Sequence, residues 1–233
     1  MQSIDELNHP GEIAVVGLGC HYPGAQTPRE LWENVLARRQ QFRAFLDERM
    51  SARDYWSADR DAPDKTYGKF GAFIDGFNFD LHSWKVPRST YEAADITHWL
   101  ALDVASRTLS DAGHAFGEGL PRERTGVVLG NSLTGEMTRA KSLRLRWPFV
   151  RRLVEAEALQ SMSPEEATRF VDALGARYLA HFPPTTEDTL AGALSNTIAG
   201  RICGAFDFGG GGYVVDGACA SSLQIGRASC RER

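Results

Sequence analysis

Three short apolar segments, each ending at a glycine or within two residues of one, most constrain the fold of this chain. They are Glu12–Gly19 (EIAVVGLG), Thr125–Gly130 (TGVVLG) and Tyr213–Val215 (YVV). Apolar, β-branched runs of this length are typical of buried strands. Longer segments with helical periodicity separate them, so strands and helices alternate. This alternation predicts a layered α/β fold with a largely parallel sheet.

Capping residues and glycines place the first helices between these strands. Thr27 can cap a helix over Pro28–Arg38, because threonine accepts from the first helical N–H groups and proline suits the first position. A long helix is predicted over Tyr91–Ala112 and is stopped by Gly113. Its core side is expected to consist of Trp99, Leu100, Leu102, Val104 and Leu109.

Helices also dominate the stretch before the last strand. A capping box at Ser163–Glu166 lies within Ser132–Ala180, which is mostly helical by pattern. Asp188 is expected to cap a buried helix of small residues over Thr189–Cys203. The basic run Arg139–Arg152 is interpreted as a solvated helical face rather than a partner site, because charge runs are usually surface.

Charge and hydropathy exclude several classes of protein. The 26 Lys and Arg against 30 Asp and Glu give a net charge of -4, which argues against a basic nucleic-acid binder. No run of about 18 apolar residues occurs, so we expect no membrane span. The leader, residues 1–11, carries Asp5 and Glu6 without an apolar core and does not resemble a secretory signal. We therefore expect a cytoplasmic protein.

No motif for a metal or a redox cofactor is present in the sequence. The four cysteines form no CxxC pair, and the six histidines show no ligand spacing, so no metal site is predicted. Gly17-Leu18-Gly19 follows an apolar run, but the third glycine of a dinucleotide fingerprint is replaced by Tyr22. We expect no cofactor-binding residues in this domain.

Cys219 has the one setting in the chain that suits covalent chemistry. In VVDGACASSL (Val214–Leu223), an apolar strand runs into a tight turn of small residues and then into a helix. The helix N-terminus stabilises thiolate over thiol, and its N–H groups can hold an oxyanion. A buried free cysteine is also a common small hydrophobe, and local chemistry leaves both interpretations of Cys219 open. Cys20 and Cys203 lack this setting and are interpreted as core residues.

The same motif carries a family resemblance. VDGACASSL resembles the nucleophile motif of β-ketoacyl synthases, Val-Asp-Thr-Ala-Cys-Ser-Ser-Ser-Leu, with Gly217 and Ala220 as departures. Three further segments are similar to those synthases: IAVVGLGCHYPGA (Ile13–Ala25), LALDVASRTLSDAG (Leu100–Gly113) and NTIAGRICGAFDFGG (Asn196–Gly210). The usual Asp-Pro-Gln-Gln-Arg segment is replaced around Ile96–Asp103.

The resemblance implies a thiolase-type layered αβαβα fold, with residues 12–223 as the N-terminal part of a β-ketoacyl synthase domain. It implies that Cys219 accepts an acyl chain from an acyl carrier protein. A malonyl unit on the carrier is then decarboxylated and condensed with that chain, which grows by two carbons. The domain itself would hold no cofactor, because the phosphopantetheine arm belongs to the carrier. The complete domain would be a homodimer.

A finer resemblance concerns the subgroup. Two segments are similar to the iterative type I polyketide synthases that build enediyne cores: STYEAADITHWLALDVA (Ser89–Ala105) and GNSLTGEMTRAKSLRLRWPFVRR (Gly130–Arg152). This resemblance implies a role in antibiotic biosynthesis. The synthases of polyunsaturated fatty acids are the neighbouring alternative. A non-catalytic protein of the chain-length-factor type is a third, although such proteins usually lack the active cysteine.

Two expectations concern the end of the chain. The family uses two histidines and a lysine that follow the nucleophile, whereas all six histidines here precede Cys219. The fold is therefore expected to be truncated after the nucleophile motif, and this fragment is predicted to be inactive in condensation. Residues 224–233, which include IGRASCRER (Ile225–Arg233), resemble a translated sequencing adapter and are interpreted as a non-native tail.

Overall fold

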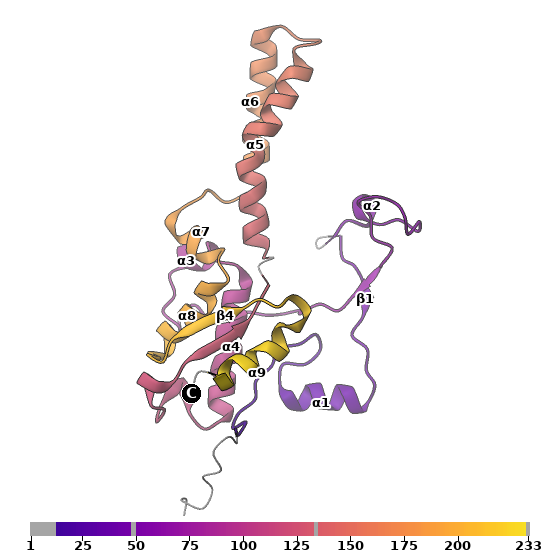
Figure 1. Cartoon of the computed structure of the whole chain (residues 1–233). Coiled ribbons are helices and arrows are strands. Elements are labelled where there is room, and N and C mark those ends of the chain that lie inside the picture. The colour runs from indigo at the N-terminus through magenta and orange to yellow at the C-terminus, as the bar shows by residue number, and fades with distance from the viewer. Residues whose placement is uncertain (1–12, 48–49, 133–134, 232–233) are drawn as a thin grey trace, which may run out of the picture. The chain divides into compact units, whose positions relative to one another are not determined.

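The computed structural model describes residues 13–47, 50–132 and 135–231, and the chain divides into two compact units. One unit comprises the chain up to Asn78 together with Val104–Glu118. The other comprises Phe79–Asp103 together with the chain from Gly119 onward. Figure 1 shows the helices and strands in chain order. The residue Glu12 and the predicted leader lie outside the described residues.

The first unit is built from short elements: α1 (Pro28–Leu36), β1 (Arg43–Ala44), α2 (Ala52–Tyr55), β2 (Phe70–Gly71) and the 3-10 turn η2 (Ala115–Gly117). The strands β1 and β2 pair antiparallel, with Arg43 opposite Gly71. The predicted cap at the start of α1 is confirmed, because Thr27 accepts from the Glu30 N–H and Glu30 reaches back to the Thr27 N–H. The helix ends at Leu36, two residues earlier than Arg38.

The strand predicted over Glu12–Gly19 is wrong for the described residues 13–19, which form no strand. Val15 is 78% exposed and Val16 is 73% exposed. A strand exists only through hydrogen bonds to a neighbour, and no described residue pairs with this segment. Instead the Leu18 N–H donates to the Asp111 carboxylate at 2.8 Å, which fixes the segment in an irregular form.

The second unit contains the larger elements: α3 (Arg88–Glu92), α4 (Ile96–Asp111, of which it holds the first half), η3 (Arg122–Arg124), β3 (Val127–Gly130), α5 (Glu136–Ala158), α6 (Pro164–Ala180), α7 (Glu187–Gly192), α8 (Asn196–Phe206), β4 (Gly212–Val215), η4 (Ala218–Ala220) and α9 (Ser221–Arg231). The strands β3 and β4 pair in parallel, from Val127 opposite Gly212 to Gly130 opposite Val215. Two of the three predicted strands and their parallel pairing are therefore confirmed.

The core of the second unit is an aromatic cluster centred on Trp99. The Trp99 side chain is 1% exposed, and its ring centroid lies 5.1 Å from that of Phe79 and 5.4 Å from that of Tyr91. The Arg201 guanidinium lies over the indole, 4.4 Å from its centroid, as in a cation–π contact. Leu102 is also buried, so Trp99 and Leu102 are confirmed as core residues of this helix, whereas the predicted core residues Leu100, Val104 and Leu109 are only half-buried.

The helix predicted over Tyr91–Ala112 is interrupted between Glu92 and Ile96, which gives α3 and α4. The Asp95 carboxylate accepts from the N–H and the hydroxyl of Thr97 at 3.0 Å and 2.8 Å, and so caps α4. The Asp95 N–H donates to the Gly192 carbonyl rather than within a helix. A tertiary hydrogen bond thus replaces a helical one and explains the break. Gly113, with φ +82°, ends α4 as predicted.

The single helix predicted over Thr189–Cys203 is likewise two helices, α7 and α8, and the cap of α7 is Thr186 rather than Asp188. The carbonyls between them serve tertiary bonds, since Gly192 accepts from Asp95 and Ala193 accepts from the Thr138 hydroxyl. Gly192 also permits a close approach, because a Cβ there would lie 2.1 Å from the Ala93 oxygen. The predicted burial is confirmed for α8.

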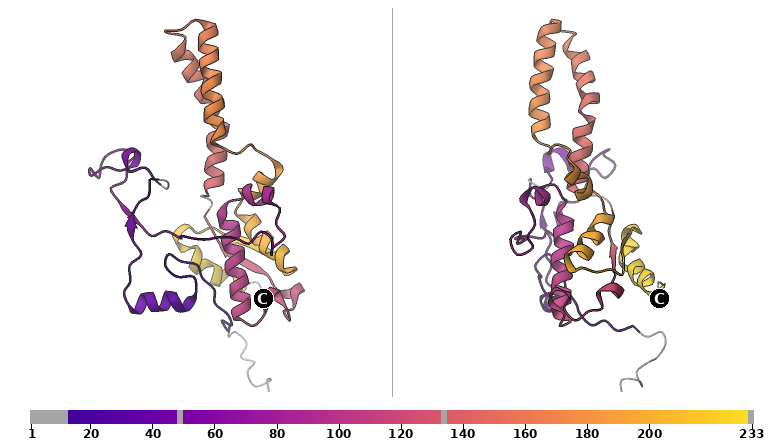
Figure 2. Two further views of the ribbon diagram at one scale, coloured as in Figure 1. Left: turned by 180° about the vertical axis from the view of Figure 1, so that it is seen from behind. Right: turned by 90° about the vertical axis from the view of Figure 1, so that its left-hand side faces the viewer.

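The helices α5 and α6 form an antiparallel hairpin that extends from the rest of the second unit (Figure 2). Its interior is built on Trp147, which lies against Gly175 and stacks on Tyr178 with centroids 5.1 Å apart. The predicted capping box at Ser163–Glu166 begins α6 and is confirmed. No helix in the described ranges has the length and hydropathy needed to cross a bilayer.

The sequence predicted that the basic run Arg139–Arg152 forms a solvated helical face, and this is only partly correct. Arg151 pairs with Asp172 at 3.0 Å, which joins α5 to α6. Arg144 donates to the carbonyls of Leu179 and Phe182, at the end of α6 and just beyond it. Part of the run therefore holds the two helices of the hairpin together.

Candidate active site

Cys219 lies in a short loop between β4 and α9, which we call the Cys219 loop and define as Asp216–Ala220. The loop leaves the carboxyl end of β4, passes through the 3-10 turn η4 and enters α9 at Ser221. The helix α9 packs against both β3 and β4 (Figure 1). The Cys219 thiol is exposed and stands two residues before the first residue of α9. The structure therefore places this cysteine at the junction that the motif predicted.

The residue before the cysteine has a strained backbone. Ala218 has φ +49°, in the left-handed region that alanine rarely adopts. Such a conformation costs about 1–3 kcal/mol and persists only where the surroundings hold it. The neighbouring Gly217, at φ -122°, does not use its freedom to relieve this turn. The strain is thus stored in the peptide unit that leads directly into Cys219.

Two side chains hold Ala218 in this conformation. The Asp216 Oδ1 accepts from the Ala218 N–H at 2.9 Å. The Ser221 hydroxyl accepts from the Gly217 N–H at 3.0 Å and donates to the Ala218 carbonyl at 2.8 Å. Both backbone groups of Ala218 are therefore bonded to side chains within the motif. Ser221 is itself buried, which restricts its rotamer.

Asp216 connects the loop to the neighbouring strand. Its Oδ1 also accepts from the hydroxyl of Ser132, which follows β3, at 2.8 Å. Two hydrogen bonds lower the pKa of the Asp216 carboxyl: the bond from the Ala218 N–H has the larger effect, and the bond from the Ser132 hydroxyl the smaller. The carboxylate form is therefore stabilised at neutral pH. Because β3 and β4 are parallel, their carboxyl ends lie at the same edge, and this brings Ser132 to Asp216.

The last residue of β3 allows α9 to lie close to the sheet. A Cβ on Gly130 would lie 3.1 Å from the Ser221 Cβ and 3.3 Å from the Ile225 Cγ2. These distances are tight for a side chain, so glycine permits the helix to pack here. Ile225 belongs to the segment interpreted above as a non-native tail; the chain remains helical through it to Arg231, and its origin stays a prediction.

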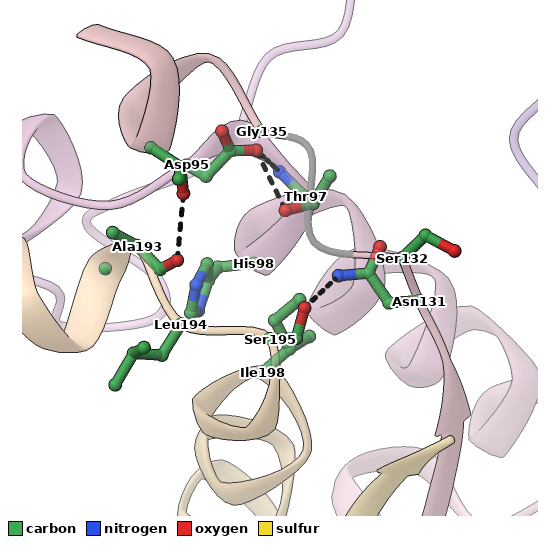
Figure 3. Close-up of a pocket in the computed structure, with 12 residues that line it drawn as sticks. Asp95, Thr97, His98, Asn131, Ser132, Gly135, Ala193, Leu194, Ser195 and Ile198 are labelled. Atoms are coloured by element: carbon green, nitrogen blue, oxygen red, sulfur yellow. Dashed lines mark hydrogen bonds between the residues drawn. The ribbon is translucent and has the colours of Figure 1, made fainter. Parts of the chain in front are cut away.

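A pocket of about 90 Å³ lies next to the carboxyl end of β3, within the second unit (Figure 3). Asn131 and Ser132 line it on the strand side, and the Asn131 amide donates to the Ser195 hydroxyl at 2.9 Å. Asp95 and His98 line it from the start of α4. The residues that follow β3 therefore contact both this pocket and the Cys219 loop.

His98 is the buried titratable group of this pocket. Its ring is 1% exposed, and Arg201 donates through Nε to its Nδ1 at 3.4 Å. Burial, and after it the charge of Arg201, lower the pKa of His98 from 6.5 to about 4, while Asp95 opposes this shift. His98 is therefore neutral at pH 7 and serves as a hydrogen-bonding core residue.

The low pKa of His98 predicts a specific loss of stability in acid. In the unfolded chain His98 is protonated below about pH 6.5, whereas in the folded chain it is protonated only below about pH 4. The free energy of unfolding therefore decreases as the pH falls from about 6.5 to about 4. Thermal melts between pH 8 and pH 4.5 measure it. His98→Gln should flatten the profile, whereas the exposed control His82→Gln should not. An unchanged slope in His98→Gln would contradict the assignment.

The other cysteines differ from Cys219. Cys20 is buried, as predicted, and burial, followed by the charge of Glu30, raises its pKa. Cys203 is half-buried; burial raises its pKa, and its Sγ lies 3.7 Å from the Gly211 carbonyl oxygen. The side chain of Cys230 lies outside the described residues. Within the described residues no group of three histidine, cysteine or acidic side chains is arranged to hold a metal.

Sequence reasoning found Cys219 but not the residues that shape its loop. Asp216 and Ser221 are inside the quoted motif, yet their hydrogen bonds to the turn were not foreseen. Ser132 was missed as well, and its signal was positional: it is a polar residue just after a strand that pairs in parallel with the strand before Cys219. The ends of parallel strands meet at one edge, so such residues are candidates for a shared site.

Known proteins match most of the chain. Residues 11–232 match the family described as "Beta-ketoacyl synthase, N-terminal domain". A polyunsaturated fatty acid synthase of Thraustochytrium sp. is 30% identical over 213 residues, which are 91% of this chain and 7% of that protein. Polyketide synthase PksL of Bacillus subtilis is 29% identical over 221 residues, which are 94% of this chain and 4% of that protein.

Solved structures share the fold. The oxazolomycin ketosynthase domain OzmH KS7 of Streptomyces albus matches with a TM-score of 0.66 and 23% identity, over 93% of this chain and 31% of that chain. The PfaC ketosynthase–chain length factor matches with a TM-score of 0.67 and 22% identity, over 93% of this chain and 22% of that chain. The predicted thiolase-type α/β fold is thus confirmed, for part of a ketosynthase domain.

Proposed function

The chain belongs to the β-ketoacyl synthase family, and on this premise we propose that Cys219 is the nucleophile that holds the growing acyl chain. The observation that carries the proposal is the position of Cys219: an exposed thiol in a strained turn at the start of α9. Cys20 and Cys203 lack both features. Cys20 is buried and Cys203 is half-buried, and burial raises the pKa of each thiol.

The proposed chemistry has two steps. The Cys219 thiolate attacks the carbonyl of an acyl thioester on a carrier protein; the carrier thiol leaves, and an acyl-Cys219 thioester remains. A malonyl thioester then loses carbon dioxide, and the resulting carbanion attacks the acyl carbonyl. The Cys219 thiolate leaves, and the chain is two carbons longer. The N–H groups of Ala218, Ala220 and Ser221 are already bonded within the turn, so the remaining backbone N–H groups around Cys219 are the candidate donors to the oxyanion formed in each attack.

We further propose the partners that this chemistry needs. An acyl carrier protein delivers both thioesters on its phosphopantetheine arm, so the domain requires no metal or redox cofactor of its own. The complete domain acts as a cytoplasmic homodimer. Family members use two catalytic histidines and a lysine that follow the nucleophile, whereas all six histidines here precede Cys219, so we expect the 233-residue chain to be inactive in condensation.

The proposed subgroup is the iterative polyketide synthases of the enediyne-core type. The segments Ser89–Ala105 and Gly130–Arg152 support it through their resemblance to that subgroup. The relative from Thraustochytrium sp., which is aligned with 91% of this chain, favours a polyunsaturated fatty acid synthase as the second candidate. The product released by the full-length synthase from malonyl and acetyl thioesters distinguishes the two: an enediyne-type polyketide supports the first and a polyunsaturated fatty acid the second.

Acyl loading tests the proposed role of Cys219. The chain is incubated with an acyl-coenzyme A thioester, digested, and mapped by mass spectrometry. We expect one acyl group per chain, attached to Cys219, because the other described cysteines are buried (Cys20) or half-buried (Cys203). An adduct spread over several cysteines, or none on Cys219 in a folded sample, would contradict the proposal and favour a non-catalytic protein of the chain-length-factor type.

A further inference from the structure

The Cys219 loop depends on the side chain of Ser132, which lies outside the nucleophile motif. Within the motif, Oδ1 of Asp216 accepts two hydrogen bonds: one from the Ala218 N–H at 2.9 Å and one from the Ser132 hydroxyl at 2.8 Å. Ser132 and Asp216 are 84 positions apart in the chain. The Ser132 hydroxyl therefore anchors, from the end of the neighbouring strand, the carboxylate that holds the loop backbone.

This anchoring matters because the turn is strained. An aspartate on an exposed loop has several rotamers, and only some of them place Oδ1 against the Ala218 N–H. The hydrogen bond from Ser132 favours the rotamer that does so. Without it, Ala218 can relax from φ +49° toward the ordinary negative region, which rotates the peptide unit leading into Cys219. The direction of the thiol is thus linked to a residue at the end of β3.

The other end of the turn is held differently. The Ser221 hydroxyl bonds to Gly217 and Ala218, but Ser221 belongs to α9 and is fixed by its burial against Gly130. Asp216 belongs to no helix, and its support comes from Ser132. The backbone of Ser132 directly follows Asn131, whose N–H continues the ladder to the Val215 carbonyl at 3.2 Å. The sheet therefore sets the position of the Ser132 hydroxyl.

We propose that Ser132 is a positioning residue for Cys219, acting through Asp216 to keep the Cys219 loop in its strained, reactive conformation. This inference rests on the proposed function of Cys219. It assigns to the residues after β3 a part in the acyl-transfer site, although Ser132 touches no reacting atom. Ser132 also lines the pocket of Figure 3, so one residue both borders this pocket and hydrogen-bonds to the Cys219 loop.

The test measures the reactivity of each cysteine separately in the full chain. Iodoacetamide labels the cysteines at a series of pH values, and mass spectrometry follows each peptide with time. In Ser132→Ala the labelling rate of Cys219 should fall roughly fivefold, the factor that corresponds to one hydrogen bond. Ser132→Thr keeps the hydroxyl and should restore most of the rate. Thr168→Ala, which deletes a hydroxyl bonded within α6 at 2.8 Å, is the matched control and should not change it.

The labelling rates of the buried Cys20 and the half-buried Cys203 separate positioning from loss of structure. If Ser132→Ala merely loosens the fold, Cys20 and Cys203 will label faster; under the proposal their rates stay constant while that of Cys219 falls. Labelling rates of Cys219 that agree within error between the wild type and Ser132→Ala would overturn the inference and leave the proposed function intact. Slow labelling of Cys219 in the wild type, at the level of Cys20, would instead count against the proposed function itself.

Discussion

Replacing Cys219 by alanine will abolish acyl loading of the chain. The acyl-enzyme needs a sulfur nucleophile, and the other described cysteines are buried or half-buried, with burial raising their pKa values. Removal of a nucleophile from an active site typically costs several orders of magnitude in rate, so we expect a loss of more than about a thousandfold. The measurement is the rate of acyl transfer from a coenzyme A thioester, followed by intact mass.

Cys203→Ala is the matched control for this prediction. It removes a thiol from the same unit, at the face of α8 that packs on β4, and it should leave the loading rate within about twofold of wild type, because this thiol is not at a helix start. Both variants should melt as the wild type does by circular dichroism. Acyl transfer that persists in Cys219→Ala on another residue would remove Cys219 from the role of nucleophile.

Truncation of Trp99 should have the largest effect on stability. The indole is 1% exposed and contacts Phe79, Tyr91 and the Arg201 guanidinium. Trp99→Ala removes this surface and leaves a cavity that the packed rings cannot fill, which costs about 3–5 kcal/mol for a large aromatic side chain. Urea unfolding measured by circular dichroism should show an earlier transition of the second unit, or a sample that does not fold.

The chain offers an exposed tryptophan as the control. Trp32 on α1 is 62% exposed, so Trp32→Ala should change the free energy of unfolding by less than about 0.5 kcal/mol. The milder Trp99→Phe keeps most of the ring volume and should lie between the two alanine variants. Equal midpoints for Trp99→Ala and Trp32→Ala would show that the aromatic cluster does not support the fold.

Local features of the sequence were predicted well where neighbouring residues satisfy them. The caps at Thr27 and Ser163 are examples, because each is completed by a glutamate three residues later. Gly113 ends α4 for the same kind of local reason, since glycine tolerates a positive φ. The position of Cys219 between β4 and α9 also follows from its own decapeptide.

Features that depend on distant partners were not predictable. The breaks that separate α3 from α4 and α7 from α8 arise because Asp95 and Gly192 hydrogen-bond each other across 97 positions of the chain. The apolar run at 13–19 has the composition of a strand, yet no described residue supplies its ladder. Periodicity reports which residues favour burial, but it contains no information about which segment will lie beside them.

The sequence by itself determined the alternation of strands and helices, the expectation of a largely parallel sheet, the family resemblance, and Cys219 as the candidate nucleophile. These depend on residue types within short windows, where one local choice is strongly favoured. Only the tertiary structure decided how the nucleophile is held. The strain at Ala218 is maintained by Asp216, and Asp216 is bonded by Ser132, which reaches it because parallel strands end at one edge of the sheet.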